Sequence, residues 1–215
     1  MVRRWQHHEY HEELNVSTAF TDLMSNAFMI LLLFLLLAIV TSFINKNVGV
    51  TDTPPIIVIQ DEGAYRFASG SATIPPAMLN YIARQIVPEI EGRTQEYNIN
   101  IVEIIGHTDG QPNGNVASNL DLNLENVARG ALPVGKLQAG SNADLGLMRA
   151  LAVVQVLRNI QLKEQRLQGL SFRAYSAAQL ILPSGEFAAI ARQEDQTRRR
   201  IEIRFTRLGK VQEVK

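Results

Sequence analysis

The chain has 215 residues, with 21 basic and 21 acidic side chains, so its formal net charge is zero. This balance excludes the broad basic surface of a general nucleic-acid-binding protein, and a content of 46% hydrophobic and 20% charged residues excludes a mostly disordered chain. The absence of cysteine excludes disulfides, thiolate catalysis and cysteine-based zinc sites.

An uncharged segment near the N-terminus predicts a membrane helix. Residues 23–44 read LMSNAFMILLLFLLLAIVTSFI and span roughly 33 Å as a helix, which matches a hydrocarbon core of about 30 Å. We therefore predict a transmembrane helix over residues 19–44, after an N-terminal tail of residues 1–18. A cleaved signal peptide is the alternative, but the segment is long, begins late and is followed by no small-residue cleavage site.

Positive charge on the two sides of this segment predicts its orientation. Arg3 and Arg4 precede it, and Lys46 lies close behind it. The positive-inside rule therefore favours a cytoplasmic N-terminus, with the large domain after residue 50 outside the cytoplasm.

One acidic residue stands where the apolar segment begins. Asp22 is followed at i+3 and i+4 by Ser25 and Asn26, so the three share one helix face. A carboxylate in or near the bilayer is costly unless it faces protein or a water-filled path. This polar face indicates an ion carrier, and a simple interfacial acid or helix cap remains an equal alternative.

The rest of the chain alternates strand and helix patterns. Residues 45–55 form a polar linker with two prolines, and a domain follows over residues 56–207 before a short tail at 208–215. The predicted fold class is α+β, an α/β sandwich with a mixed sheet covered by helices on one side. Strands are predicted at 56–60, 98–106, 170–175 and 201–206, and helices at 75–92 and 144–159, with Pro88 expected to bend or end the first helix.

Two segments lack a clear period. Residues 110–141 are rich in asparagine, glycine and serine, and are long for a structureless loop in a compact domain, so we expect them to be functional or mobile. Residues 183–198 form a second irregular connection, with one possible helical turn at Glu186–Arg192.

Polar residues at the end of a predicted strand form a candidate binding site. Thr108 and Asp109 follow the apolar strand at 98–106, while Asn142 and Arg149 lie at the entry and in the first turns of the next helix. Asp109 suits an ammonium group and Arg149 suits a carboxylate, so the site could bind a ligand that carries both. The alternative is a structural Asp–Arg ion pair with an Asn cap.

Other charged residues give weaker signals. The arginines at 198–200 precede the last strand, where neighbours point to opposite faces, so only some could reach one site. His7 and His11 have i, i+4 spacing but no convincing third ligand, so no metal is predicted. No nucleophile–base pair or phosphate loop is present, and we predict neither an enzyme nor a cofactor.

These motifs together resemble the OmpA-like peptidoglycan-binding domain. The matching segments are FASGSATI (67–74), VEIIGHTDGQP (102–112), NADLGLMRALAVVQVL (142–157) and RRIEI (199–203). The resemblance implies that Asp109 and Arg149 grip the diaminopimelate of the cell-wall peptide, with Thr108, Asn142 and Arg200 nearby. The chain departs from the family at Gly146, where serine is usual, at Arg198, where asparagine is usual, and in the long segment after GHTD.

An acidic membrane helix joined to such a domain is similar to the B subunits of ion-driven stators, including flagellar MotB. Residues 17–33 lack the proline that follows the acid in flagellar members, and the Thr-Asp-Leu-Met form is more similar to ZorB of the Zorya anti-phage defence systems. This resemblance implies a single-pass protein of the bacterial inner membrane with a periplasmic domain, and a homodimer inside a pentameric ring of MotA-like (ZorA-like) subunits.

The implied activity is that of a proton-driven rotary motor. Asp22 would carry H⁺ (or Na⁺), with Ser25 and Asn26 beside it, and the outer domain would hold the motor to peptidoglycan. No direct contact with nucleic acid is expected. A flagellar stator subunit and a passive wall anchor without ion transport are the alternative functions.

Overall fold

The structure is a computed structural model that describes residues 12–48, 54–114, 116–209 and 213. It divides after residue 53 into two compact units. Residues 1–11 of the N-terminal tail with His7 and His11, residues 49–53 of the predicted linker, and part of the C-terminal tail lie outside the described residues.

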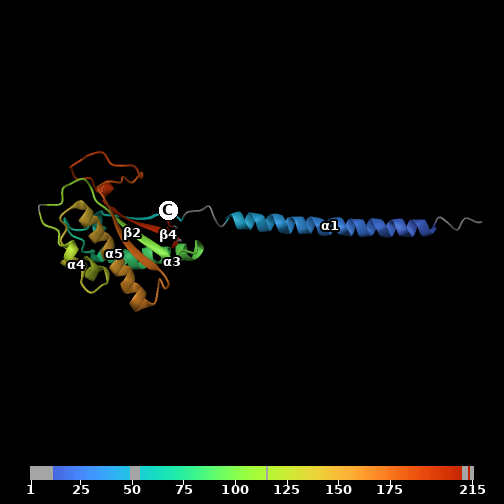
Figure 1. The fold of residues 1–215 in the computed structure, drawn as a ribbon, viewed down its shortest axis with the longest axis horizontal. Helices are drawn as coiled ribbons and strands as arrows, with labels where there is room; N and C mark the ends of the chain where they lie inside the picture. Colours follow the sequence, from blue (N-terminus) through green and yellow to red (C-terminus); the bar gives the residue numbers. More distant parts are fainter. Residues whose placement is uncertain (1–11, 49–53, 115, 210–212, 214–215) are drawn as a thin grey trace, which may run out of the picture. The chain divides into compact units, whose positions relative to one another are not determined.

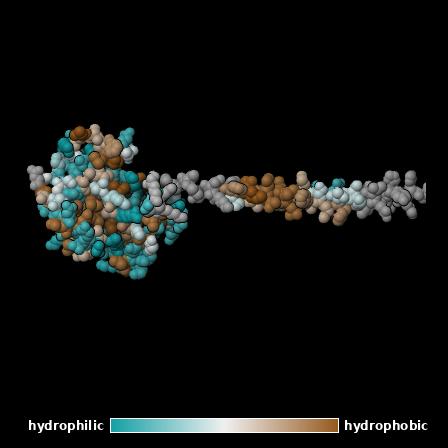
Figure 2. Space-filling model, viewed as in Figure 1, coloured by the Kyte–Doolittle hydropathy of each residue, from teal (hydrophilic) through white to brown (hydrophobic). Residues whose placement is uncertain are grey.

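The first unit contains one long helix, α1 (Glu12–Val48), of 37 residues. Within it, Ser17–Phe43 is long and apolar enough to cross a membrane, and Figure 2 shows its hydrophobic side chains in brown. Thr21 and Thr41 donate their hydroxyl hydrogens to carbonyls one turn earlier, at 2.8 and 2.9 Å. These polar groups are therefore satisfied inside the helix, as a bilayer requires. A second apolar helix, Asn142–Glu164, is mostly buried in the other unit.

The second unit is built on a four-stranded sheet with the order β1-β4-β2-β3, and Figure 1 labels its two central strands, β4 and β2. The strands are β1 (Ile57–Gln60), β2 (Ile101–His107), β3 (Ser171–Ala178) and β4 (Arg200–Thr206). β4 pairs antiparallel with both β1 and β2, whereas β2 and β3 are parallel. The predicted mixed sheet and α+β fold class are confirmed.

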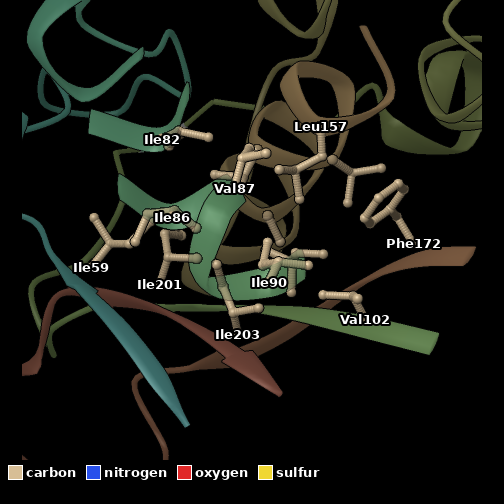
Figure 3. Packing of buried hydrophobic residues seen from close by; sticks show 14 of the residues in the cluster. Ile59, Ile82, Ile86, Val87, Ile90, Val102, Leu157, Phe172, Ile201 and Ile203 are labelled. Atoms are coloured by element: carbon tan, nitrogen blue, oxygen red, sulfur yellow. The ribbon is translucent and has the colours of Figure 1, made fainter. Parts of the chain in front are cut away.

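Helices cover one face of this sheet and bury its core. The helical elements are α2 (Pro76–Tyr81), a π-helical turn η2 (Ile82–Ile86), α3 (Val87–Glu96) and the crossover helix α5 (Asn142–Glu164). Figure 3 shows Val87 and Ile90 above the strands, opposite Ile201 and Ile203 of β4. These four side chains are at most 2% exposed. Residues 201 and 203 alternate with the polar residues 200 and 202 because neighbours in a strand point to opposite faces.

We expected Pro88 to bend or end its helix, and it does not end it. The helix continues to Glu96, and Pro88 is the second residue of α3, directly after the π-helical turn. In that turn the Val87 N–H donates to the Ile82 carbonyl, five residues back. The wider turn makes room for the proline ring, which in a regular helix clashes with the carbonyl four residues earlier.

The segment 110–141 is not the structureless loop that its composition suggested. It contains α4 (Leu120–Ala128) and a 3₁₀ turn, η3 (Val134–Lys136). Leu120 and Val127 are buried against α5, together with Leu145 and Met148. The sequence hid this helix because Leu120, Leu122 and Leu124 alternate as in a strand, and Leu122 is 79% exposed.

The connection after β3 also differs from its prediction. No helical turn forms at Glu186–Arg192; residues 180–188 instead form a short hairpin, with an antiparallel bridge between Ile181 and Phe187. A 3₁₀ turn, η4 (Gln196–Arg198), then leads into β4. A further 3₁₀ turn, η1 (Gly63–Tyr65), follows β1.

Candidate ligand-binding pocket

An open pocket of about 110 Å³ lies beyond the end of β2. Thr108 and Asp109, which directly follow that strand, form part of its wall, and Asn142 and Arg149 of α5 form another part. The four predicted residues are therefore brought together. The remaining lining residues are Arg66, Phe67, Ser69, Gly70, Gln111, Pro112, Asn113, Gly114, Leu145 and Arg199.

Arg149 is held on three sides by the protein. Its Nη1 lies 3.2 Å from Oδ2 of Asp61, its Nε donates to the Ser71 carbonyl at 3.1 Å, and its guanidinium carbon lies 4.8 Å from the centre of the Phe67 ring. Burial lowers the pKa of Arg149, and the nearby Asp61 carboxylate opposes this effect. The structure thus contains an Asp–Arg ion pair, but the partner of Arg149 is Asp61 and not Asp109.

Asp61 is a site residue that the sequence reasoning missed. It follows β1 directly, is 4% exposed, and accepts a 2.6 Å hydrogen bond from the Phe67 N–H. Its position, an acid at the end of a short apolar strand, was the available signal, since strand ends at one sheet edge converge. The sequence does not indicate that the partner of Asp61 is Arg149, which lies 88 residues further along the chain.

Arg199 connects the two carboxylates. Its Nη1 lies 3.6 Å from Asp109 Oδ2, its Nε lies 3.8 Å from Asp61 Oδ2, and its Nη2 pairs with Glu194 at 3.1 Å. Arg199 is only 9% exposed, yet its Nε–H has no hydrogen-bond partner among the described residues. The Asp61 carboxylate lies too far from this N–H for a hydrogen bond but close enough to compensate its charge.

Asp109 and Thr108 complete the floor of the pocket. Asp109 accepts backbone hydrogen bonds from Gln111 and Asp195, both at 3.2 Å, which fix its carboxylate. The Thr108 hydroxyl is buried, and Oγ1 has no hydrogen-bond partner in the described part of the chain. Thr108 Oγ1 and Arg199 Nε, two atoms without a hydrogen bond in the described structure, therefore belong to residues of the same pocket wall, and Arg199 Nε keeps its ion pair with Asp61.

Asn142 acts on the backbone of the pocket wall. Its side-chain NH₂ group donates to the carbonyls of Asp109 and Gln111, at 3.2 and 2.9 Å. Ser141 caps α5 by accepting from the Asp144 N–H at 3.2 Å. Asn142 thus ties the start of α5 to the segment after β2.

Arg200 points away from the pocket that the resemblance assigned to it. Its guanidinium donates to Glu202 at 2.7–2.8 Å and to the Leu182 carbonyl at 3.1 Å, and it is 2% exposed. Arg198 similarly donates to the Gln179 carbonyl. Because neighbouring strand residues face opposite ways, Arg199 lines the pocket in place of Arg200. Arg198 and Arg200 hold the hairpin that follows β3.

Beside Arg200 lies a buried histidine outside the pocket. The His107 ring is 1% exposed, and its Nε2 lies 3.3 Å from Glu202. Burial lowers the pKa of His107, and the positive charge of Arg200 adds to this effect.

Glycine allows α5 to approach the end of β2 closely. A Cβ added at Gly106 would lie 2.0 Å from the Gly146 carbonyl oxygen, and one added at Gly146 would lie 2.9 Å from the Gly106 carbonyl oxygen. Gly146 is one helical turn before Arg149. The unusual glycine in this motif therefore accompanies a backbone contact that sets how near Arg149 comes to Asp109.

The pocket carries charges of both signs. Three arginines line it, Arg66, Arg149 and Arg199, and each pairs with a carboxylate at the site, Glu194, Asp61 or Asp109. Arginine forks bind carboxylates in plane, and Asp109 can accept further hydrogen bonds from an ammonium group. Within the described ranges, no group of three or more His, Asp or Glu side chains could hold a metal ion.

The predicted membrane residues lie in the other unit. Asp22, Ser25 and Asn26 occupy consecutive turns on one side of α1 and are exposed in the single chain, as are all residues at 17–43. Their role in ion transport stays a prediction.

No family model matches the sequence, and no curated protein is significantly similar to it. The structure is similar to the periplasmic domain of Helicobacter pylori MotB, with 19% identity and a TM-score of 0.40, covering 73% of this chain and 82% of that one. A putative MotB-like protein from Desulfovibrio vulgaris gives 16% identity and a TM-score of 0.41, covering 72% of this chain and 74% of that one. An OmpA-like domain from Francisella tularensis gives 16% identity and a TM-score of 0.33, covering 75% of this chain and 88% of that one. Likenesses this loose assign no function.

Proposed function

We propose that this chain anchors a membrane complex to peptidoglycan, with α1 in the bacterial inner membrane and the pocket in the periplasm. The observation that supports this most directly is the buried Thr108 hydroxyl, which has no hydrogen-bond partner among the described residues, in a pocket that also carries Asp109 and Arg199. Peptidoglycan peptides contain diaminopimelate, a residue with both carboxylate and ammonium groups. The OmpA-like resemblance implies that this residue is the ligand.

In this proposal each end of such a residue meets a different side chain. The Arg199 guanidinium pairs with the ligand carboxylate, while Asp109 accepts from the ligand ammonium. Arg149 contributes positive charge, but Asp61 and the Ser71 carbonyl already occupy two of its nitrogens. Arg199 is engaged as well, through Nη2 with Glu194 and at longer range with Asp109 and Asp61, so we expect the two arginines to share the ligand carboxylate.

Retention of the full-length chain, purified in detergent, on isolated cell-wall sacculi tests this proposal. Asp109→Asn and Arg199→Gln should each weaken retention at least tenfold, because each removes a charge that meets the ligand. Arg173→Gln is the matched control, since Arg173 is exposed on β3 and not among the pocket-lining residues. Retention that is the same in Asp109→Asn, Arg199→Gln and the wild type would reject the proposal.

Arg149→Ala is a poor test on its own. The change would leave the buried Asp61 carboxylate without its main cation, and breaking a buried pair in this way costs about 3–5 kcal/mol. Loss of sacculus retention in that variant would then reflect unfolding as easily as loss of ligand contact.

We further propose that the chain is the B subunit of a proton-driven rotary motor that acts in anti-phage defence. The supporting observation is the polar face of Asp22, Ser25 and Asn26 on a helix otherwise apolar enough to span a membrane. A homodimer would place two such helices inside a pentameric ring of MotA-like subunits. Protonation would neutralise Asp22 and change its preference for the ring surface. One charge moved across 100 mV supplies about 2.3 kcal/mol for a rotational step.

Copurification with the protein encoded by the neighbouring gene tests the motor assembly. Mass measurement of the complex should give five copies of the partner for two of this chain. A one-to-one complex, or full anti-phage protection by this chain without its partner, would contradict the motor. Chemotaxis genes next to this one would instead support a flagellar stator.

A further inference from the structure

Exposed apolar side chains project beside the pocket. Leu180, Phe187 and Ile190, which we call the apolar tip, are 54%, 80% and 92% exposed. They belong to the hairpin after β3 and the residues that follow it. Figure 1 shows this orange-red segment looping out from the rest of the domain, and Figure 2 shows hydrophobic residues at its end.

The hairpin is a fixed part of the structure. The Ala188 N–H donates to the Leu180 carbonyl at 2.8 Å, and the Leu182 N–H donates to the Glu186 carbonyl at 2.9 Å. Arg200 of β4 also donates to the Leu182 carbonyl, at 3.1 Å. A surface held in this way can present apolar side chains without paying the entropy of ordering a loose loop.

The segment that follows the apolar tip packs against the chain next to Asp109. Ala191, the neighbour of Ile190, packs so closely on Gly110 that an added Cβ there would lie 1.7 Å from the Ala191 carbonyl oxygen. Gly110 directly follows Asp109, and the Asp195 N–H donates to the Asp109 carboxylate. The segment that carries the tip is therefore tied to the pocket at Asp109.

We propose that the apolar tip contacts the glycan strand of the same polymer whose peptide residue enters the pocket. This inference rests on the proposed function. A pocket of about 110 Å³ is small beside a polymer, so the rest of the polymer must lie on the surface around it. Hexopyranose rings present flat faces of C–H groups, which pack on an exposed phenyl ring and aliphatic side chains.

Two other occupants fit less well. An anionic bilayer surface attracts basic segments, but residues 180–195 contain three acidic side chains and one basic side chain. A second copy of this chain would need roughly 800 Å² per partner for a stable interface, and three side chains supply only part of that. A polymer already held by the pocket needs only a small added contact.

Two binding probes, isolated sacculi and free diaminopimelate, distinguish the tip from the pocket. The affinity of the full-length chain in detergent is measured for each. In the double variant Phe187→Ser with Ile190→Ser, affinity for isolated sacculi should fall about tenfold. Its affinity for free diaminopimelate should stay within twofold of the wild-type value. Leu162→Ser is the control, because Leu162 is 72% exposed near the far end of α5 and should bind both probes normally.

Three results would overturn the inference. The first is wild-type sacculus affinity in the double variant. The second is an equal loss of diaminopimelate affinity, which would place the effect in the pocket. The third is a change in the oligomeric mass of the double variant, which would identify the tip as a contact between copies. If Asp109→Asn abolishes sacculus binding while the double variant binds normally, the proposed function stands and only this inference fails. If the wild type binds neither probe, both fail.

Discussion

Three consecutive arginines in this chain have three different surroundings. Arg199 lines the pocket, Arg200 lies under the hairpin with Glu202, and Arg198 donates to the Gln179 carbonyl. Strand alternation predicted that they would separate, but the face that each would take depends on the register of β4 against β1 and β2. That register is set by contacts distant in sequence. Asp61 was missed for the same reason, because its contact with Arg149 joins residues that are far apart in the sequence.

The Thr108 hydroxyl offers the sharpest test at the residue scale. Thr108→Val keeps the shape and removes a buried group that lacks a hydrogen-bond partner in the described structure. We expect the free energy of unfolding to stay the same or rise by about 1 kcal/mol, while sacculus affinity falls about fivefold to tenfold. Urea denaturation and sacculus retention measure the two effects. Unchanged retention would show that this hydroxyl does not meet the ligand.

At the scale of elements, sequence patterns were reliable where one face of a segment is buried. The strands and the main helices were predicted because their apolar residues recur with the period of the element. The helix α4 was missed because exposed Leu122 breaks that period, and the effect of Pro88 was misjudged because a π-helical turn absorbs it. Four predicted pocket residues converged, since they lie at one strand end and at the start of the helix packed on it.

The surroundings of two glycines predict opposite effects of alanine substitution on stability. Gly106→Ala should lower the free energy of unfolding by about 2–3 kcal/mol, because the new methyl group meets the backbone carbonyl of Gly146. Gly92→Ala should raise it by about 0.5–1 kcal/mol, since Gly92 lies in α3 with no atom within 4 Å of an added Cβ. Urea denaturation followed by circular dichroism tests both. Equal stability of the two variants would contradict the close contact.

At the scale of the whole molecule, buried ionisable groups predict that acid destabilises the sheet. Burial lowers the pKa of His107 in the folded state below its ordinary value of 6.5. The unfolded chain therefore binds more protons below pH 6.5, and stability falls as the pH decreases. Burial alone would raise the pKa of Glu202, but hydrogen bonds from Arg204 and Arg200 outweigh it and lower the pKa below 4.5. Its stabilising contribution is present above pH 4.5 and is lost below.

We expect the free energy of unfolding to decrease from pH 7 to pH 5, by at most about 1.4 kcal/mol per pH unit from His107. A second decrease should begin below pH 4.5, as Glu202 becomes protonated. His107→Gln should remove the first decrease and keep the second. Urea denaturation at a series of pH values measures both. An identical decrease between pH 6.5 and 4.5 in the variant would exclude His107 as its cause.

The proposed motor role of α1 makes a prediction about ion transport. Asp22→Asn preserves the shape of the side chain and removes its titratable charge. We expect it to abolish proton flux into vesicles that contain the copurified complex, together with anti-phage protection, and to leave assembly intact. Ser42→Ala, at the other end of the apolar segment, is the matched control. Normal flux in Asp22→Asn would remove this carboxylate from the transport path, and the chain would then be a passive anchor.

The position of β4 in the sheet has a consequence for biosynthesis. β4 comes last among the strands along the chain, yet it lies between β1 and β2 and is the strand through which β1 joins the sheet. While a ribosome is still making the chain, β1 has no neighbour to pair with, and its apolar residues stay unprotected. The sheet can close only after translation has passed Thr206. A premature stop codon before Arg200 would therefore yield two unjoined pieces of sheet, a substrate for quality-control proteases and not a shortened domain.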